Sequence, residues 1–211
     1  MDIQNYHRKR TWALINTTMA QTLLQRLEAA LRKEALAPGT RQAQQWLLQK
    51  TKNLKPTRQA LLNDKENLRN KTIIGRMYYF FYDPKLKDIL PYYDRFPLVI
   101  PIERYADGFL GLNLHYVTPK TRVRLLNKLS AYLTNDQYDE KTRFRLSYDM
   151  LRGASSISEF EPCLKRYLYT QVESRFLEIP AAEWDIACLL PNEQFAKKST
   201  SFVQRESARN I

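Results

Sequence analysis

Five carboxylates in the middle of the chain are the side chains whose type and spacing best suit catalysis. They are Asp83, Asp88, Asp94, Glu103 and Asp107. A metal-dependent nuclease needs such groups to converge on one point. However, two of them stand directly before a proline or a glycine, which is an ordinary place for aspartate in turns. Two others are each followed by an arginine that can balance their charge. Turn formation and charge pairing are therefore favoured over a nuclease site.

Histidine and cysteine offer little further chemistry. The chain has only His7 and His115, so a Ser-His or Cys-His nucleophile would depend on His115. We predict a structural role for His115 on a strand, with one ring nitrogen bonded to the backbone. Cys163 and Cys188 show no metal-ligand spacing and are expected to be reduced, buried thiols. Phosphate-binding, hydrolase and metalloprotease motifs are also missing. We therefore predict a protein that is not an enzyme, with no catalytic residue, metal or cofactor.

The charge of the chain is strongly positive and unevenly distributed. The net charge is +12, and residues 1–71 hold 14 Lys and Arg against 5 Asp and Glu. Such an excess suits nucleic acid, an anionic membrane or an acidic protein. Its basic residues could bind phosphates, or could simply form solvated helix faces, and the sequence leaves both readings open. The candidates for binding DNA or a partner are His7, Arg8, Lys9, Arg10, Arg26, Arg32, Lys33, Arg41, Lys50, Lys52, Lys55 and Arg58.

The elements that position these basic residues are expected to be helices. Apolar spacing and breaking residues predict helices over residues 11–37, 41–53 and 56–70, with Thr40 as the cap of the second. Their apolar stripes are narrow, and such helices seldom fold alone. We expect this basic arm, residues 1–71, to pack on a copy of the chain or on a larger assembly rather than on the rest of its own chain.

The composition changes at Thr72, where a compact domain is predicted to span residues 72–211. Residues 72–85 and 96–105 read as extended segments, and two prolines place the second at a sheet edge. Residues 109–117 alternate as a third strand. Helices are expected over 120–134, where Thr118 and Pro119 begin the helix, and over 159–172 and 180–191. Residues 139–153 are ambiguous between helix and strand, and helix is preferred. A strand is expected at 174–180, and a polar helix or tail from residue 192. The fold class is α+β: a helical arm, a small bent antiparallel sheet resembling an SH3-like half-barrel, and packed helices.

Aromatic residues form a second candidate surface. The unbroken run Tyr78–Tyr82 must divide between two faces of a strand, one in the core and the other exposed or covered. Cover by the arm or a partner subunit is favoured over base stacking. We predict a docking surface for partner subunits from the following residues: Tyr92, Tyr93, Asp94, Arg95, Phe96, Asn113 and His115.

Nothing in the sequence predicts membrane insertion or export. No apolar run approaches the roughly 20 residues that span a bilayer, and the first residues contain no signal-peptide pattern. We expect a protein made in a cytoplasm.

Several segments resemble a known family. They are "GRMYYFFYDPK", "LPYYDRFPLVIPIE", "DGFLGLNLHY", "GASSISEFEPCLKRYL", "SRFLEIPAAEWDIACLLP" and "FAKKST". Together they are similar to virion-associated proteins of T-even-like contractile-tailed bacteriophages, a group that includes DNA end protectors and tail or baseplate structural proteins. The resemblance covers residues 75–211 and leaves out the arm. It implies a non-enzymatic protein of the virion, assembled in the host cytoplasm, and it carries over no catalytic residue.

Three functional hypotheses follow. The first is a structural or assembly component of a tailed-phage virion, in the tail baseplate or at the head–tail junction. It would dock through residues 72–211 and contact other virion subunits, or copies of itself in a symmetric assembly, through the basic arm. The second is a protein that binds the ends of duplex DNA and protects the packaged genome from host nucleases. The third is the metal-dependent nuclease.

Overall fold

The computed structural model describes residues 22–37, 40–51, 53–54, 65–133, 149–151, 153 and 158–209. The labelled α-helices are α2 (Leu23–Lys33), α3 (Arg41–Thr51), α5 (Pro119–Leu133), α7 (Trp184–Leu189) and α8 (Thr200–Arg209). The 3₁₀ helices are η1 (Lys65–Asn67), η2 (Leu114–Tyr116), η3 (Ser158–Cys163), η4 (Tyr169–Gln171) and η5 (Ala181–Glu183). The strands are β1 (Leu68–Arg69), β2 (Met77–Tyr79), β3 (Tyr93–Asp94), β4 (Leu98–Tyr105), β5 (Gly108–Asn113), β6 (Leu164–Leu168), β7 (Phe176–Ile179) and β8 (Phe195–Ala196).

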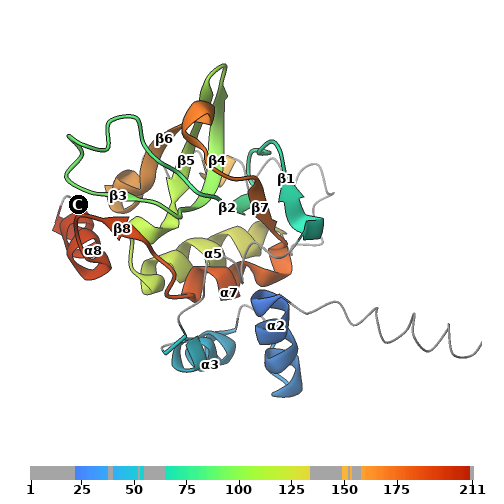
Figure 1. Cartoon of the computed structure of the whole chain (residues 1–211). Helices are drawn as coiled ribbons and strands as arrows, with labels where there is room; N and C mark the ends of the chain where they lie inside the picture. The colour runs from blue at the N-terminus through green and yellow to red at the C-terminus, as the bar shows by residue number, and fades with distance from the viewer. Residues whose placement is uncertain are drawn as a thin grey trace, which may run out of the picture.

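The strands form a bent antiparallel sheet. Its order is β1-β7-β2-β4-β5-β6, and β3 pairs with β8 in a separate two-stranded sheet. Beyond β2, Tyr82 makes a bridge to Val172, which precedes β7, so the bridge extends the β2–β7 pair. The sheet is bent so that side chains of β2 and β6 meet in one apolar cluster. The hydroxyl of Tyr82 also accepts a hydrogen bond of 3.3 Å from the backbone N–H of Leu168. These findings confirm the predicted α+β class and its bent sheet (Figure 1).

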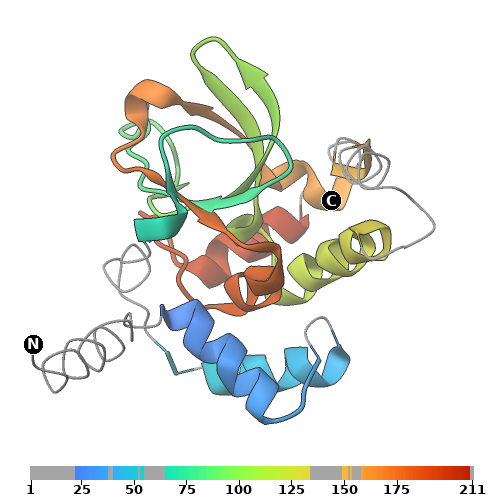
Figure 2. The ribbon, with the colours of Figure 1, turned by 90° about the vertical axis from the view of Figure 1, so that its right-hand side faces the viewer.

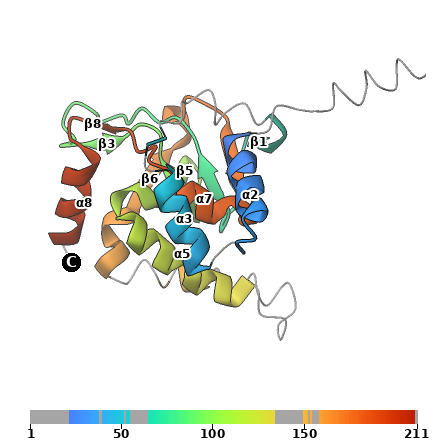
Figure 3. The same ribbon diagram turned by 90° about the horizontal axis from the view of Figure 1, so that it is seen from below.

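The helices lie in two layers beneath the sheet. In Figures 1 and 2, α5 and α7 lie next to the sheet, and α2 and α3 lie on the far side of α7. Seen from below, α2 and α3 cross over α7 and α5 (Figure 3). Leu24, Leu31 and Leu47 from α2 and α3 belong to the same apolar core as α5 and α7. The described helices of the arm therefore pack on their own chain, which the sequence analysis did not expect.

Polar contacts fix this packing. The hydroxyl of Thr51 at the end of α3 lies 2.8 Å from the carbonyl of Leu47 and 3.2 Å from the carbonyl of Leu189, so the two carbonyls share its proton. The side-chain amide of Gln44 donates to Asn127 on α5 at 3.2 Å. The predicted cap of α3 is confirmed, because the hydroxyl of Thr40 accepts from the N–H of Ala43 at 3.2 Å. The boundary predicted at Thr72 stays a prediction, but the described residues on its two sides share one core.

The aromatic run Tyr78–Tyr82 is buried on both of its faces. Tyr79 and Phe81 enter the main core, where both stack on Phe96 at centroid distances of 5.0 and 4.5 Å. The other three side chains form a second core with residues from β4 to β7: Tyr78, Phe80, Tyr82, Val99, Phe109, Tyr167 and Phe176. The curl of the sheet itself therefore covers the second face, rather than the arm or a partner. The burial of this run removes it as a platform for base stacking.

Strand β4 is internal, not the edge strand that its prolines predicted. It lies between β2 and β5. A central strand tolerates Pro101 here because β2 pairs with β4 only at Leu98 and Val99. The missing N–H of Pro101 therefore faces no ladder partner on β2, and the register against β5 shifts between Pro101 and Glu103. The short length of β2, which the sequence does not reveal, is therefore what allows a proline inside an internal strand.

Three other predicted elements differ. Residues 159–172 do not form a helix: η3 ends at Cys163, and β6 then pairs with β5. The described end of the helix predicted at 56–70 consists of η1 and β1, because β1 pairs with β7. His115 lies in η2 rather than on a strand. For β1 and β6, pairing with a strand distant in sequence determines the conformation. His115 follows the last residue of β5, so it lies beyond the end of that strand. The beginnings of the helices predicted at 11–37, 56–70 and 139–153 lie outside the described residues.

Other predictions hold. The strand at 174–180 is confirmed as β7, the short helix at 180–191 as η5 and α7, and the helix in the last stretch as α8. Cys163 and Cys188 are buried and not joined by a disulfide. None of the described helices has the length and apolar character needed to cross a membrane.

Candidate nucleic-acid interface

The basic residues predicted to bind DNA or a partner fall into two groups. Some lie outside the described residues: His7, Arg8, Lys9, Arg10, Lys52, Lys55 and Arg58. The others are exposed on α2 and α3: Arg26, Arg32, Lys33, Arg41 and Lys50. Arg32 makes an ion pair with Glu28 at 2.6 Å, and the ammonium of Lys50 lies 5.6 Å from the ring centroid of Trp46. Their binding role stays a prediction, but the described members are all accessible.

Helix α2 presents positive charge on the face opposite its buried stripe. The helix begins at a capping box, in which Thr22 and Gln25 each accept the other's backbone N–H at 3.1 and 3.0 Å. Leu24 and Leu31, seven residues apart, are buried against the core. Arg26 and Lys33 have the same spacing two positions later and are exposed, as helical geometry requires. Within the described part of the chain, neither has a carboxylate within ion-pair distance.

A groove of about 570 Å³ lies between the β4–β5 hairpin and the β1–β7 edge of the sheet. Lys71, Arg104 and Tyr105 are among its lining residues. The guanidinium of Arg104 donates to the carbonyl of Thr72 at 2.6 Å, which holds that side chain along the groove. The ring of Tyr105 is 39% exposed, and the guanidinium carbon of Arg166 lies 4.1 Å from its centroid. Cations beside an exposed aromatic ring are typical of grooves that bind single nucleic-acid strands. The sequence analysis missed this groove, since only the fold brings these residues together.

The residues predicted as a docking surface are placed very differently from one another. Arg95 is exposed, and Tyr92 and Tyr93 are half-buried. The other four are in the interior: Asp94, Phe96, Asn113 and His115. These four cannot contact a partner in the described conformation. A docking role stays a prediction for the first three alone.

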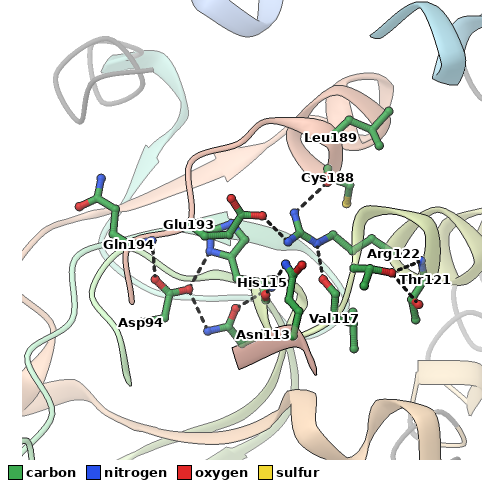
Figure 4. A network of polar contacts seen from close by, with 12 residues as sticks. Asp94, Asn113, His115, Val117, Thr121, Arg122, Cys188, Leu189, Glu193 and Gln194 are labelled. Carbon is green, nitrogen blue, oxygen red and sulfur yellow. Dashed lines mark hydrogen bonds and ion pairs between the residues drawn. The ribbon is translucent and has the colours of Figure 1, made fainter. Parts of the chain in front are cut away.

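Asp94 is the centre of a buried polar network (Figure 4). One of its carboxylate oxygens lies 2.7 Å from Nδ1 of His115 and accepts from the amide of Asn113 at 3.2 Å. The other accepts from the backbone N–H groups of Phe96 and Gln194 at 3.1 and 3.4 Å. Burial acts to raise the pKa of Asp94, but the charge of His115 and the hydrogen bonds outweigh it and hold this pKa below its ordinary value.

This network corrects the role predicted for His115. The histidine is structural in its surroundings, but its partner is a carboxylate rather than the backbone. The same contact replaces the local charge pairing that we expected between Asp94 and Arg95. His115 is fully buried, and its Nε2 has no partner among the described residues. The side chains of His115 and Asp94 are only 0% and 1% exposed, so the geometry gives no support to catalysis by this pair.

Arg122 forms a second buried network beside the first (Figure 4). Its guanidinium donates to the carbonyls of Val117 and Cys188 at 3.1 and 3.0 Å and pairs with the carboxylate of Glu193. Arg122 is fully buried. Burial acts to raise the pKa of Glu193, but the charges of Arg122 and His115 hold it below its ordinary value. Both networks connect the chain before α8 to the centre of the fold, and neither opens to solvent as a reactive site.

The acidic residues that suggested a nuclease do not converge. Asp83 pairs with Lys87 at 2.6 Å, Asp107 pairs with Arg166, and Glu103 accepts from the hydroxyl of Tyr105 at 2.9 Å. Asp94 is occupied in the core. Within the described residues, no group of three or more histidine, cysteine or acidic side chains is placed to hold a metal ion.

Comparison with known proteins gives one match. A family model described as phage T4 terminal DNA protecting protein matches residues 3–211. The match covers nearly the whole chain, including the arm, where the sequence analysis had found no resemblance. No curated protein and no solved structure is significantly similar to the chain.

Proposed function

Since the chain belongs to the phage T4 terminal DNA protecting protein family, we propose that it binds the ends of duplex phage DNA and shields them from nucleases. The match favours this role over the tail or baseplate role that the sequence analysis placed first. The protein would act by occupying the DNA terminus, without catalysis. Its partner is duplex DNA, and its place is the virion or the host cytoplasm in which the virion assembles. Contacts with other virion subunits remain a further part of the proposal.

The observation that supports DNA binding most directly is the exposed charge of Arg26 and Lys33 on α2, which has no counter-charge among the described residues. Arg26 and Lys33 are turned away from the core, so DNA can approach them without any change in the packing of the helix. Contacts of lysine and arginine with phosphates carry no sequence information. A protein that protects the end of a genome needs such contacts, because it must hold the duplex whatever its local sequence.

The double variant Arg26→Gln/Lys33→Gln tests this surface. We expect it to bind linear duplex DNA more weakly than the native protein, by a similar factor for different sequences. Each lost phosphate contact should reduce the slope of log affinity against log salt by about 0.9, so the two changes should reduce it by roughly 2. Fluorescence anisotropy over a salt series measures both quantities. Because phosphate contacts release counterions, the native protein should bind most tightly at low salt, near about 50 mM.

Lys120→Gln/Lys128→Gln is the matched control. It removes the same charge from exposed positions on α5, so it should change the salt slope less than the variant on α2. Equal slopes for the two variants would assign the effect to net charge and remove the α2 face from the proposal. The protective function itself is measured by digestion of linear DNA with an end-dependent exonuclease. Native protein that neither binds duplex DNA at low salt nor slows this digestion would overturn the proposed function.

A further inference from the structure

A cleft on another side of the molecule has features that DNA binding by charge does not explain. It consists of two adjoining cavities of about 290 and 250 Å³. Tyr92, Tyr116 and Lys165 line both cavities. The cleft lies between β6, the loop that precedes β3, and α8. Figure 1 shows these three segments on the same side of the molecule. Each cavity is slightly smaller than the about 300–1,000 Å³ typical of ligand pockets, so the two together can admit a small molecule but not a duplex.

Lys165 is a positive charge for which the described residues provide no ion-pair partner. Its ammonium lies 4.3 Å from the ring centroid of Tyr116. In the described part of the chain it has neither a hydrogen-bond acceptor nor a carboxylate within ion-pair distance. Lys165 is half-buried, and burial lowers its pKa because the ammonium has lost part of its hydration. Buried charges in proteins are usually paired or hydrogen-bonded, so an anion from outside would complete this site.

Ser207 on α8 points to the same kind of ligand independently. It is only 3% exposed, and its hydroxyl has no partner among the described residues. It lines the second cavity together with Lys165. A hydroxyl and an ammonium that both lack partners provide two donors for the oxygens of a phosphate. Glu161 also lines this cavity, but it is exposed and its charge is therefore screened by water.

The first cavity has aromatic walls that are held in place. Tyr92, Tyr93 and Tyr167 contribute to its lining, and Asn113 and Asp94 lie there as well. Lys197 fixes the outer wall, because its ammonium donates to the carbonyls of Lys87, Asp88 and Leu90 at 2.7, 2.9 and 2.8 Å. The loop before Tyr92 is therefore tied to the segment that precedes α8. A preformed aromatic wall beside an unpaired cation fits a base and its phosphate.

We infer that this cleft holds one unpaired nucleotide at the end of a DNA strand, with the base against the tyrosines and the phosphate on Lys165 and Ser207. The inference rests on the proposed function and gives it the feature that it lacks, a means of telling an end from an interior position. Phosphate contacts along a duplex are the same at both places. Only a terminal nucleotide has a single stacked neighbour, so it leaves the helix at the lowest cost.

The test compares linear and covalently closed circular DNA of the same sequence in a binding assay, with single unpaired nucleotides at the linear ends. We expect the native protein to bind the linear form more tightly. Lys165→Gln and Tyr92→Ala should each weaken binding to the linear form by about tenfold or more, which is the scale of one lost stacking contact. Binding to the circle should not change. Lys128→Gln, an exposed lysine outside the cleft, should leave both affinities close to native.

The possible outcomes separate the two proposals. Native protein that binds no DNA overturns the proposed function, and the inference with it. Native protein that binds both forms equally, or variants that keep the native preference for ends, overturns the inference alone. Competition by a deoxynucleoside monophosphate that releases linear DNA and not the circle would support a nucleotide in the cleft. Lys165→Gln removes only a half-buried side chain, so the test does not depend on Tyr92→Ala remaining folded.

Discussion

Replacement of Arg122 by methionine should lower the free energy of unfolding by about 3–5 kcal/mol, the usual cost of leaving one member of a buried ion pair alone. Methionine fills much of the same space but donates no hydrogen bond. The carboxylate of Glu193 would keep its buried position and lose its counter-charge, and the carbonyls of Val117 and Cys188 would lose their donors. Denaturant unfolding followed by circular dichroism at neutral pH measures the change.

Two further variants identify the cause. Lys128→Met changes an exposed residue on the same helix and should stay within about 0.5 kcal/mol of the native protein. Arg122→Met/Glu193→Gln also removes the unpaired charge, so it should recover part of the stability that the single variant loses. If the double variant is no more stable than Arg122→Met, the buried carboxylate is not the source of the loss.

Acid should unfold the protein through Asp94. Its pKa is lowered in the folded state, so the unfolded chain binds a proton first as the pH falls. The stability that this carboxylate contributes is therefore fully present above its ordinary pKa of about 3.9 and is lost as the pH falls through the lower folded value. Glu193, whose pKa is lowered as well, acts in the same direction from its ordinary value of about 4.3. The free energy of unfolding should fall steeply below about pH 4.

The variant Asp94→Asn separates this carboxylate from the others. At neutral pH it should be less stable than the native protein by about 3 kcal/mol or more, since it weakens several buried bonds to a charged acceptor. The difference should stay constant above about pH 4 and shrink as the pH falls from there through the lowered pKa of the native carboxylate. Urea titrations over this range give both curves. Parallel curves throughout would mean that Asp94 is not linked to acid unfolding.

These buried networks also bear on the proposed DNA-end site. Asp94 is bonded to the backbone of Gln194, next to Glu193, and β3 pairs with β8 at the same place. This connection sets the position of the segment that leads into α8, and α8 contributes Ser207 to the cleft. The buried networks of Asp94 and Arg122 therefore help to shape the cleft. Asp94 and His115 therefore help to hold this segment in place.

Much of the local structure and the family were predictable from the sequence. The capping threonine at position 40, the apolar spacing of α2 and α3, and the strand at β7 follow from short-range rules. The bent sheet was predicted from the three extended segments and their turns. The phage family followed from the motifs in residues 75–211, and the family match then extended it to the arm. The excess of positive charge in the first third was visible in the sequence.

The spatial neighbours of these elements were determined only by the tertiary structure. It turned residues 164–168 into a strand, made β4 internal, and covered both faces of the aromatic run. It also buried Asp94 and His115, which looked like surface residues, and brought Lys165 beside Ser207. The physical reason is the same in each case. Helix caps and periodicity depend on neighbours a few residues away, whereas strand pairing, desolvation and the convergence of a binding site depend on residues far apart in the chain.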